Sequence, residues 1–264
     1  MVKIHVFAVR YKENPEPFIK RFYADPIVKS SNINLTIINN YDYLSVEDPR
    51  VTVINNTLRP DFSTGHLSRN WNEAIINGFR NLNLPSVDYV IGVQIDAILG
   101  DTWYQDLMKV LKIYPELHYL ALGEGDEFQV FTPQVIKTVG LYDERFCNIG
   151  YQEADYFYRV RLLKPLNAVI LDHKHGRVMN NIGLDELDVR GIVIRNPSKE
   201  VNDAHRLSMA HHNDSLKVFY YKWGHTNPEH WTEIEIDPGT SRGKEFRYYP
   251  YFEKAVDPWV YVIQ

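Results

Sequence analysis

A carboxylate follows a run of apolar, β-prone residues near the middle of the chain. Residues 87–95 (VDYVIGVQI) predict a buried strand, and Asp96 is the first residue after it. An acid where a buried strand meets solvent can contact a metal ion or a nucleotide. Hard cations prefer oxygen ligands, and open α/β sheets bind ligands beyond the carboxyl ends of their strands. The alternative interpretation is that Asp96 caps the turn after the strand.

Histidines form a second group of side chains that can bind metals. His173 and His175 follow a short predicted strand at residues 168–171, and three more lie further along the chain, at His205, His211 and His212. A metal-dependent hydrolase built around these histidines is therefore one hypothesis. No His-x-Glu or His-Glu-x-x-His spacing accompanies them, and such spacing is typical of zinc hydrolases.

The composition is that of a globular protein and gives no sign of nucleic-acid binding. The chain has 264 residues, 44% apolar and 24% charged, and a net charge of −5, whereas binding to a phosphate backbone needs a basic surface. No segment approaches the roughly 18 continuous apolar residues of a membrane span. Cys147 is the only cysteine, which excludes an internal disulfide. Residues 1–6 lead directly into a strand instead of a signal peptide, so the sequence predicts a cytoplasmic protein.

Predicted strands and helices alternate along most of the chain. Strands are predicted at residues 2–9, 33–38, 51–54, 87–95, 117–122, 128–131 and 168–171. Helices are predicted at residues 18–22, 64–78, 102–113, 133–140, 152–163 and 198–221. This alternation predicts an α/β protein with a mostly parallel central sheet and helices on both faces. Beyond Gly224 the sequence has no strong period and predicts a wrapping of loops and short strands.

Four stretches, in this order, resemble the nucleotide-sugar-dependent glycosyltransferases of the GT-A fold, especially glycosyltransferase family 2. Residues 65–75 (GHLSRNWNEAI) are similar to the family's Gly-x-small-x-Arg-Asn-x-Gly-x-x-Ala helix. Residues 94–96 (QID) occupy the place of its Asp-x-Asp motif. Residues 146–159 look like its acidic helix start that ends in an arginine, and residues 172–175 (DHKH) stand where the family often has a histidine after a strand.

The resemblance implies a fold and an activity. The fold would be a single Rossmann-like GT-A domain, with a nucleotide-sugar-binding half at residues 1–122 and an acceptor-binding half and C-terminal wrap at residues 123–264. The activity would be that of a hexosyl- or pentosyltransferase. It would move a sugar from a nucleotide-diphosphate sugar to a hydroxyl of a glycan or glycoconjugate, with inversion at the anomeric carbon. The sugar, the base and the acceptor depend on a few pocket contacts in loops, which these motifs do not specify.

Transfer from a nucleotide sugar needs help with a leaving group that accumulates negative charge. Mn²⁺ or Mg²⁺ bridging the two phosphates would supply that help. Asp96 is the first-choice ligand, and the resemblance places His173 or His175 in the same shell. Gln94, which replaces the first acid of the Asp-x-Asp motif, is assigned to donor binding together with Asp96. Because of this replacement, a non-catalytic carbohydrate-binding module with a degenerate site is a further hypothesis.

The acceptor hydroxyl must lose its proton as it attacks, so a carboxylate within reach would act as general base. Glu153 aligns with the family's base position, although Gln152 and Glu153 replace the usual Glu-Asp pair. Asp155 is the rival candidate. It lies four residues before Arg159 on the predicted helix, where an ordinary ion pair is the alternative interpretation.

Donor recognition is expected at the carboxyl ends of the first strands, where open α/β sheets bind ligands. The residues there that would contact the base or the ribose are Ala8, Val9, Arg10, Tyr11, Asn39 and Asp42. Arg69 is assigned to the phosphate or the base, with a solvated helix position as the alternative.

Aromatic side chains are candidates for the acceptor cleft because sugars lie on aromatic faces. The four candidates are Trp103, Tyr151, Trp223 and Trp231. For each of them a role in the core or in an interface is the alternative.

Overall fold

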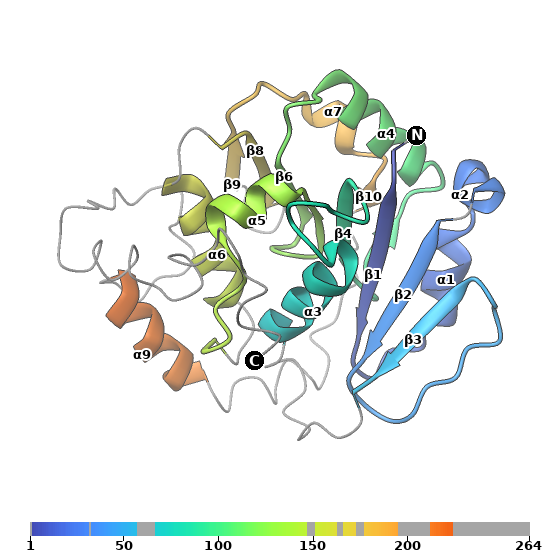
Figure 1. Cartoon of the computed structure of the whole chain (residues 1–264), viewed down its shortest axis with the longest axis horizontal. Helices are drawn as coiled ribbons and strands as arrows, with labels where there is room; N and C mark the ends of the chain where they lie inside the picture. The colour runs from blue at the N-terminus through green and yellow to red at the C-terminus, as the bar shows by residue number, and fades with distance from the viewer. Residues whose placement is uncertain are drawn as a thin grey trace.

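The computed structural model describes residues 2–31, 33–56, 67–146, 151–162, 166–172, 177–194 and 212–223. Its centre is an eight-stranded sheet with the strand order β3-β2-β1-β4-β7-β6-β8-β9 (Figure 1). The strands are β1 (Ile4–Arg10), β2 (Asn34–Asn39), β3 (Val51–Asn55), β4 (Tyr89–Gln94), β6 (Tyr119–Gly123), β7 (Phe128–Phe131), β8 (Ala168–Asp172) and β9 (Arg177–Asn180).

The sheet is mostly parallel, as the sequence predicts. Strands β1 to β4 run in one direction, and so do β6 and β8, while β7 and β9 run against their neighbours. Parallel strands that are covered on both faces are apolar almost throughout. Accordingly every residue of β6 and β8 is buried, and so are all but the two ends of β4.

Helices cover both faces of the sheet. One apolar cluster joins the sheet to α1 (Glu16–Phe22), α2 (Pro26–Ser30) and α4 (Trp103–Ile113), with Trp103 fully buried inside it. The other joins it to α3 (Leu67–Phe79), α5 (Pro133–Val139), α6 (Tyr151–Leu162) and α9 (His212–Trp223), with Trp71 fully buried. The predicted layering is thereby confirmed.

Asp25 connects two helices on the first of these faces. One carboxylate oxygen accepts hydrogen bonds from the amides of Ile27 and Val28 at the start of α2, and the other accepts from those of Tyr104 and Gln105 at the start of α4. A buried acid is stabilised in this place because both helix N-termini present otherwise unpaired N–H groups. The sequence predicted that residues 25 and 26 end a helix. In the structure α1 ends at Phe22, and Asp25 and Pro26 begin α2.

Besides α2, four shorter elements were missing from the prediction. They are the antiparallel pair β5 (Ile98–Leu99) and β10 (Val193–Ile194), the edge strand β9, and α7 (Glu186–Val189). Elements of two to four residues carry too little periodicity to be recognised in a sequence. The helix predicted at 198–221 is described only as α9, and its predicted cap at Ser198 lies outside the described residues, as does the wrapping predicted beyond Gly224.

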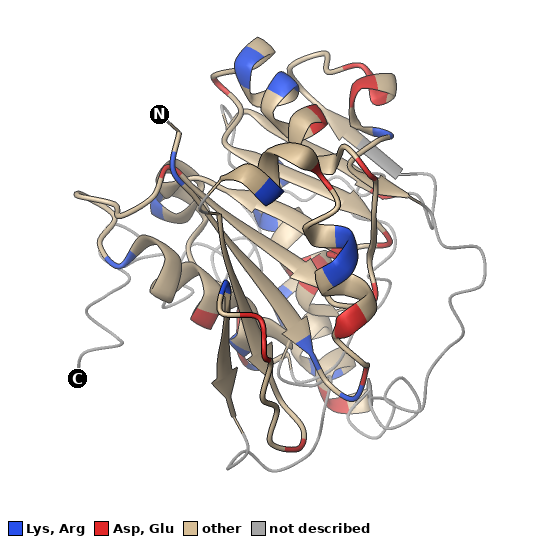
Figure 2. Ribbon diagram, turned by 90° about the vertical axis from the view of Figure 1, so that its right-hand side faces the viewer, with Lys and Arg blue, Asp and Glu red and all other residues tan. Residues whose placement is uncertain are grey.

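Acidic and basic positions are interspersed over the ribbon, without a basic stripe in the part of the chain that is described (Figure 2). Within that part, no helix combines the length and the apolar character that a membrane crossing requires. The sheet continues across the predicted boundary between residues 122 and 123, because β7 inserts between β4 and β6. The division into two halves stays a prediction.

Candidate functional site

The carboxyl ends of the parallel strands meet at one edge of the sheet, which we call the carboxyl edge. The strand registers pair Val9 with Gln94, Arg10 with Asn39, and Gly123 with Asp172. Residues from distant parts of the sequence therefore share this edge. The sequence-predicted donor residues at 8–10, 39 and 94 belong to it.

A turn rich in glycine and acids lies at the same edge. Residues 123–127 (GEGDE), here called the acidic turn, connect β6 to β7. Gly123 and Gly125 have φ angles of 96° and 67°, in the left-handed region that favours glycine. The turn is tied to β4 because the Gln94 backbone amide donates a hydrogen bond to the Glu127 carbonyl at 2.9 Å.

Asp126 of the acidic turn is fully buried and lies at the centre of the site. Its carboxylate accepts a hydrogen bond from Trp71 Nε1 at 2.6 Å and one from Gln94 Nε2 at 2.8 Å. Burial raises the pKa of Asp126, and the hydrogen bonds from Trp71 and Gln94, together with the nearby Gln152 and Glu153 side chains, act in the opposite direction by stabilising its charge. The acidic turn thus brings α3, β4 and α6 together.

Glu153 packs its carboxyl group against the backbone of the acidic turn. A Cβ atom at Gly125 would lie 2.6 Å from Glu153 Oε1 and 2.7 Å from its Oε2. Only a glycine leaves room for the carboxyl in this position. The neighbouring Gln152 is 1% exposed and close enough to Asp126 to help stabilise its charge. Neither polar atom of the Gln152 side chain has a hydrogen-bond partner of regular geometry among the residues the structure describes.

The sequence prediction missed the acidic turn. Two glycines and three acids between two predicted strands were the available signal. Such a segment normally indicates a solvated loop. Nothing in the local sequence indicates that Asp126 is buried, because Trp71 and Gln94, which bury it, come from distant parts of the chain.

Asp155, the rival base candidate, belongs to a buried ion network on the other side of α6. Lys222 Nζ lies 2.6 Å from Asp155 Oδ1, and Arg159 Nε lies 3.0 Å from Oδ2. Trp223 Nε1 donates to Oδ1 as well, at 2.9 Å. Both carboxylate oxygens are thus engaged by structural partners, and Asp155 is 0% exposed. This geometry agrees with the ion-pair interpretation of Asp155.

Asp96 lies in the turn after β4, partly exposed, and the amide of Ala97 closes that turn by donating to the Gln94 carbonyl at 3.0 Å. His173 and His175, its proposed partners, lie outside the described residues, although β8 ends at Asp172 beside Gly123. Within the described ranges, no three His, Cys, Asp or Glu side chains converge in a way that could hold a metal.

The hydrolase hypothesis also involves His205, His211 and His212. His205 and His211 lie outside the described residues, and His212 is the first residue of α9.

The predicted donor residues at β1 and β2 form a network of their own. Arg10 Nη1 donates to Asn39 Oδ1 at 2.5 Å and to Asp42 Oδ1 at 3.2 Å, and Arg10 Nε donates to the Glu13 carbonyl. Arg10 is buried and thereby fixes the loops after both strands. Ala8 is fully buried in the core, and Val9 is partly exposed one residue later.

An aromatic pair stands beside this network. The rings of Tyr11 and Tyr41 meet edge to face with centroids 5.3 Å apart. Lys12 Nζ lies 4.9 Å from the first centroid and 4.8 Å from the second. Tyr41 was not predicted, although it follows Asn39 and Asn40 at the strand end.

Arg69 pairs with Glu144 on the surface, with 3.1 Å between Nε and Oε2, which agrees with the alternative of a solvated helix position. Three of the proposed acceptor aromatics are core residues: Trp103, Tyr151 and Trp223 are 0%, 3% and 5% exposed. Trp231 lies outside the described residues.

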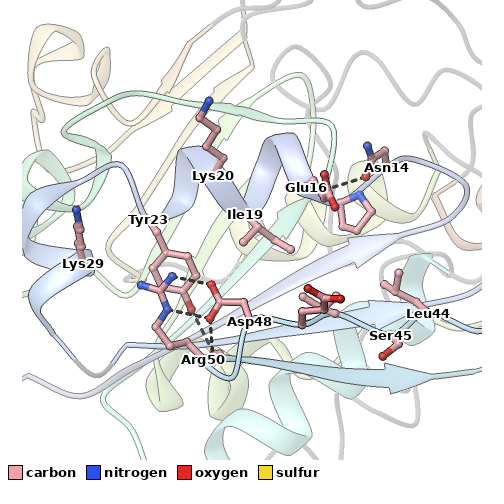
Figure 3. Close-up of a pocket in the computed structure, with 13 residues that line it drawn as sticks. Asn14, Glu16, Ile19, Lys20, Tyr23, Lys29, Leu44, Ser45, Asp48 and Arg50 are labelled. Atoms are coloured by element: carbon pink, nitrogen blue, oxygen red, sulfur yellow. Dashed lines mark hydrogen bonds and ion pairs between the residues drawn. The ribbon is translucent and has the colours of Figure 1, made fainter.

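A separate groove of about 720 Å³ lies between α1 and the connection from β2 to β3 (Figure 3). Arg50 stacks on the Tyr23 ring in this groove, 3.7 Å from the centroid, and its guanidinium donates two hydrogen bonds to Asp48. Cations and anions both line it, and none of the predicted site residues does.

The strand order and the acidic carboxyl edge define a GT-A fold, the fold of nucleotide-sugar glycosyltransferases. The structure of a mannosyltransferase from Pyrobaculum calidifontis matches with a TM-score of 0.50 and 11% identity, over 99% of this chain and 74% of that one. TarS 1–349 from S. aureus matches with a TM-score of 0.46 and 11% identity, over 99% and 79%. No family model and no curated protein sequence matches the chain. The predicted fold is confirmed, and membership of family 2 stays a prediction.

Proposed function

We propose that the chain is a glycosyltransferase that moves a sugar from a nucleoside-diphosphate sugar to a hydroxyl of a glycan or glycoconjugate, with inversion. The observation that carries this proposal is the position of Glu153 on a GT-A fold. Its carboxyl lies against the acidic turn at the carboxyl edge. That turn is hydrogen-bonded to Gln94, where β4 ends and the turn with Asp96 begins. The proposed base and the proposed donor residues would then share one edge of the sheet, as group transfer between two bound substrates requires.

The donor nucleotide would bind where β1 and β2 end. Tyr41, which is 40% exposed, offers an aromatic face for a base or ribose and packs against the buried Tyr11. The Arg10–Asn39–Asp42 network holds the loops that carry both rings. The pyrophosphate would then extend toward Gln94 and Asp96 at the end of β4, the strand next to β1.

One described side chain at this site, Asp96, suits a divalent cation. Asp96 presents a partly exposed carboxylate at the strand end, which is the donor type that Mn²⁺ and Mg²⁺ prefer. Asp96, together with His173 or His175, would hold the ion. The similar mannosyltransferase structure is a complex with GDP-Man and Mn²⁺. When bound, such an ion supplies neutralisation of the charge that develops on the leaving diphosphate.

Glu153 would accept the proton of the attacking acceptor hydroxyl. The oxygen–carbon bond to the sugar forms as the bond to the β-phosphate breaks, and the leaving diphosphate keeps the electron pair. Attack from the face opposite to the leaving group inverts the anomeric centre. The choice of a hexosyl or pentosyl donor, and a cytoplasmic location, remain part of the proposal.

The test is a panel of nucleotide sugars, incubated with Mn²⁺ or Mg²⁺ and assayed for release of nucleoside diphosphate. We expect slow donor hydrolysis with one or a few sugars, and binding of the same sugars by calorimetry. Glu153→Gln should keep binding within about threefold and lose transfer by roughly 10²-fold or more, since general bases contribute on the order of 10²–10⁴. Asp96→Asn should weaken binding only when the metal is present. No binding of any nucleotide sugar, with or without metal, would reject the proposal.

A further inference from the structure

Three elements of the proposed site converge on one buried side chain that has no assigned role. Asp126 accepts hydrogen bonds from Trp71 of α3 and Gln94 of β4, and hydrogen bonding from Glu153 of α6 contributes to stabilising its charge. Its exposure is 0%. Burying a carboxylate costs free energy unless hydrogen bonds compensate. The buried Asp126 carboxylate therefore requires the donors that surround it.

The groups that face Asp126 set its charge. Glu153 is the acidic neighbour, Gln94 and Gln152 are neutral amides, and Trp71 is a neutral donor. The phenols of Tyr119 on β6 and Tyr142 after α5 are also close enough for Asp126 to raise their pKa values further, so both phenols stay neutral. Two carboxyl groups in contact do not both ionise easily when one of them is fully buried, as Asp126 is, even though Glu153 is partly exposed.

The same contacts account for Gln94. A glutamate at position 94, which has the length of Gln94, would bring its carboxylate to hydrogen-bond distance from Asp126 and repel it. The amide instead donates to Asp126 at 2.8 Å. Gln94 therefore differs from the first acid of the Asp-x-Asp pattern in a way that suits Asp126, because an amide can donate to the buried carboxylate on the neighbouring turn.

We propose that Asp126 is the positioning residue of the transferase site, which shares a proton with Glu153 and holds the Glu153 carboxyl over Gly125. When the shared proton leaves, both carboxyls are ionised and the site is active; Trp71 and Gln94 then stabilise the charge of Asp126. The proton that leaves the acceptor hydroxyl is taken up by Glu153 and shared with Asp126. The negative charge of Asp126 makes Glu153 a stronger base than an isolated glutamate. This inference rests on the proposed function.

Asp126→Asn tests the inference through the pH profile. The variant can fold because the oxygen of the new amide can still accept from Trp71. If the Gln94 amide flips, its oxygen can accept from the nitrogen of the new amide. Loss of the neighbouring charge lowers the pKa of Glu153. The acid limb of the kcat profile should therefore move to lower pH by about one pH unit or more. The plateau rate should fall about tenfold or more, and the donor KM should change less than about threefold.

Trp71→Phe should move the acid limb of the kcat profile in the opposite direction. It removes one hydrogen bond to the ionised form of Asp126, so the acid limb should move to higher pH. Asp25→Asn is the control, because Asp25 is equally buried but bonds only to helix amides on the other face. Asp25→Asn should lower the free energy of unfolding and leave the kcat–pH profile of the folded enzyme unchanged. Profiles that coincide with the wild type in both site variants would overturn the inference.

Two measurements are independent of turnover. The Glu153 carboxyl can be titrated by ¹³C NMR in the wild type and in Asp126→Asn, and an unchanged midpoint would refute the shared proton. Gln94→Glu should unfold at lower urea concentration than the double variant Gln94→Glu/Asp126→Asn, because in the double variant the amide introduced at position 126 can donate to the carboxylate introduced at position 94. A double variant that is no more stable than Gln94→Glu alone would refute the hydrogen-bond pairing. Wild-type protein that binds no nucleotide sugar would instead reject the proposed function, while these two measurements would still decide the role of Asp126.

Discussion

Substitution of Gly125 by alanine should separate catalysis from folding. The added Cβ atom would lie 2.6 Å from Glu153 Oε1, whereas ordinary van der Waals contact begins at about 3.4 Å. Because the backbone of the acidic turn is held by β6 and β7, the Glu153 carboxyl has to move by about 0.8 Å. A misplacement of about 1 Å can cost on the order of 10²-fold in rate. We therefore expect transfer to fall by about 10- to 100-fold.

The stability cost of Gly125→Ala has a matched control. Gly125 has a φ of 67°, and an L-residue in that left-handed region loses roughly 1–2 kcal/mol. Gly183 has a φ of 70°, and its Cβ would meet nothing within 4 Å. Gly183→Ala should therefore lose a similar free energy of unfolding and keep its activity.

The assay combines urea unfolding with release of nucleoside diphosphate from the donor found in the panel. Gly125→Ala and Gly183→Ala should unfold at similarly lowered urea concentrations, and only the first should lose activity per folded molecule. If Gly125→Ala transfers sugar within about threefold of the wild type, the position assigned to Glu153 is wrong. Equal losses of activity in both variants would mean that backbone strain, and not displacement of Glu153, explains the effect.

Two further predictions concern stability. Lys222→Ala should lower the free energy of unfolding in urea by about 3 kcal/mol, the low end for breaking a buried ion pair. It removes the cation that Asp155 and Asp143 share, while Arg159 still pairs with Asp155 and Arg145 with Asp143. A loss below about 1 kcal/mol would contradict this. Burial, followed by the nearby Arg80, lowers the pKa of His5 to about 4 from its ordinary 6.5. The folded state then binds fewer protons than the unfolded state, so the contribution is complete above pH 6.5 and is lost as the pH falls toward 4. His5→Gln should lose less free energy of unfolding between pH 6.5 and 4 than the wild type does. If the two stability curves run parallel over this range, His5 does not cause the pH dependence.

Much of the fold followed from local patterns in the sequence. Alternating apolar strands and amphipathic helices predicted the parallel sheet. In residues 64–78, Leu67, Trp71, Ala74, Ile75 and Gly78 recur at three- and four-residue spacing, which predicted the buried face of α3. The position of β7 did not follow. A four-residue strand carries no information about its partners, and β7 inserts between β4 and β6 through pairings up to 41 residues distant in sequence.

The site was predictable only where its residues end strands. Arg10, Asn39 and Gln94 were expected at the carboxyl edge because parallel strands end together. Asp126 was not, because its burial depends on the Trp71 indole, 55 residues earlier in the sequence. The periodicity of α3 classed Trp71 as a core residue and gave no sign that its Nε1 needed an acceptor.

The two acids of α6 show why the helix register decides their roles. Glu153 and Asp155 are two residues apart, which corresponds to a rotation of about 200° around a helix of about 3.6 residues per turn. If Glu153 faces the acidic turn, Asp155 must face nearly the opposite direction. There it meets Arg159 one turn later and Lys222 of α9. An insertion of one residue before Tyr151 would not exchange these roles, because both acids would rotate together. Asp155 therefore anchors the helix from behind, while Glu153 is presented to the carboxyl edge, where the proposed base would act.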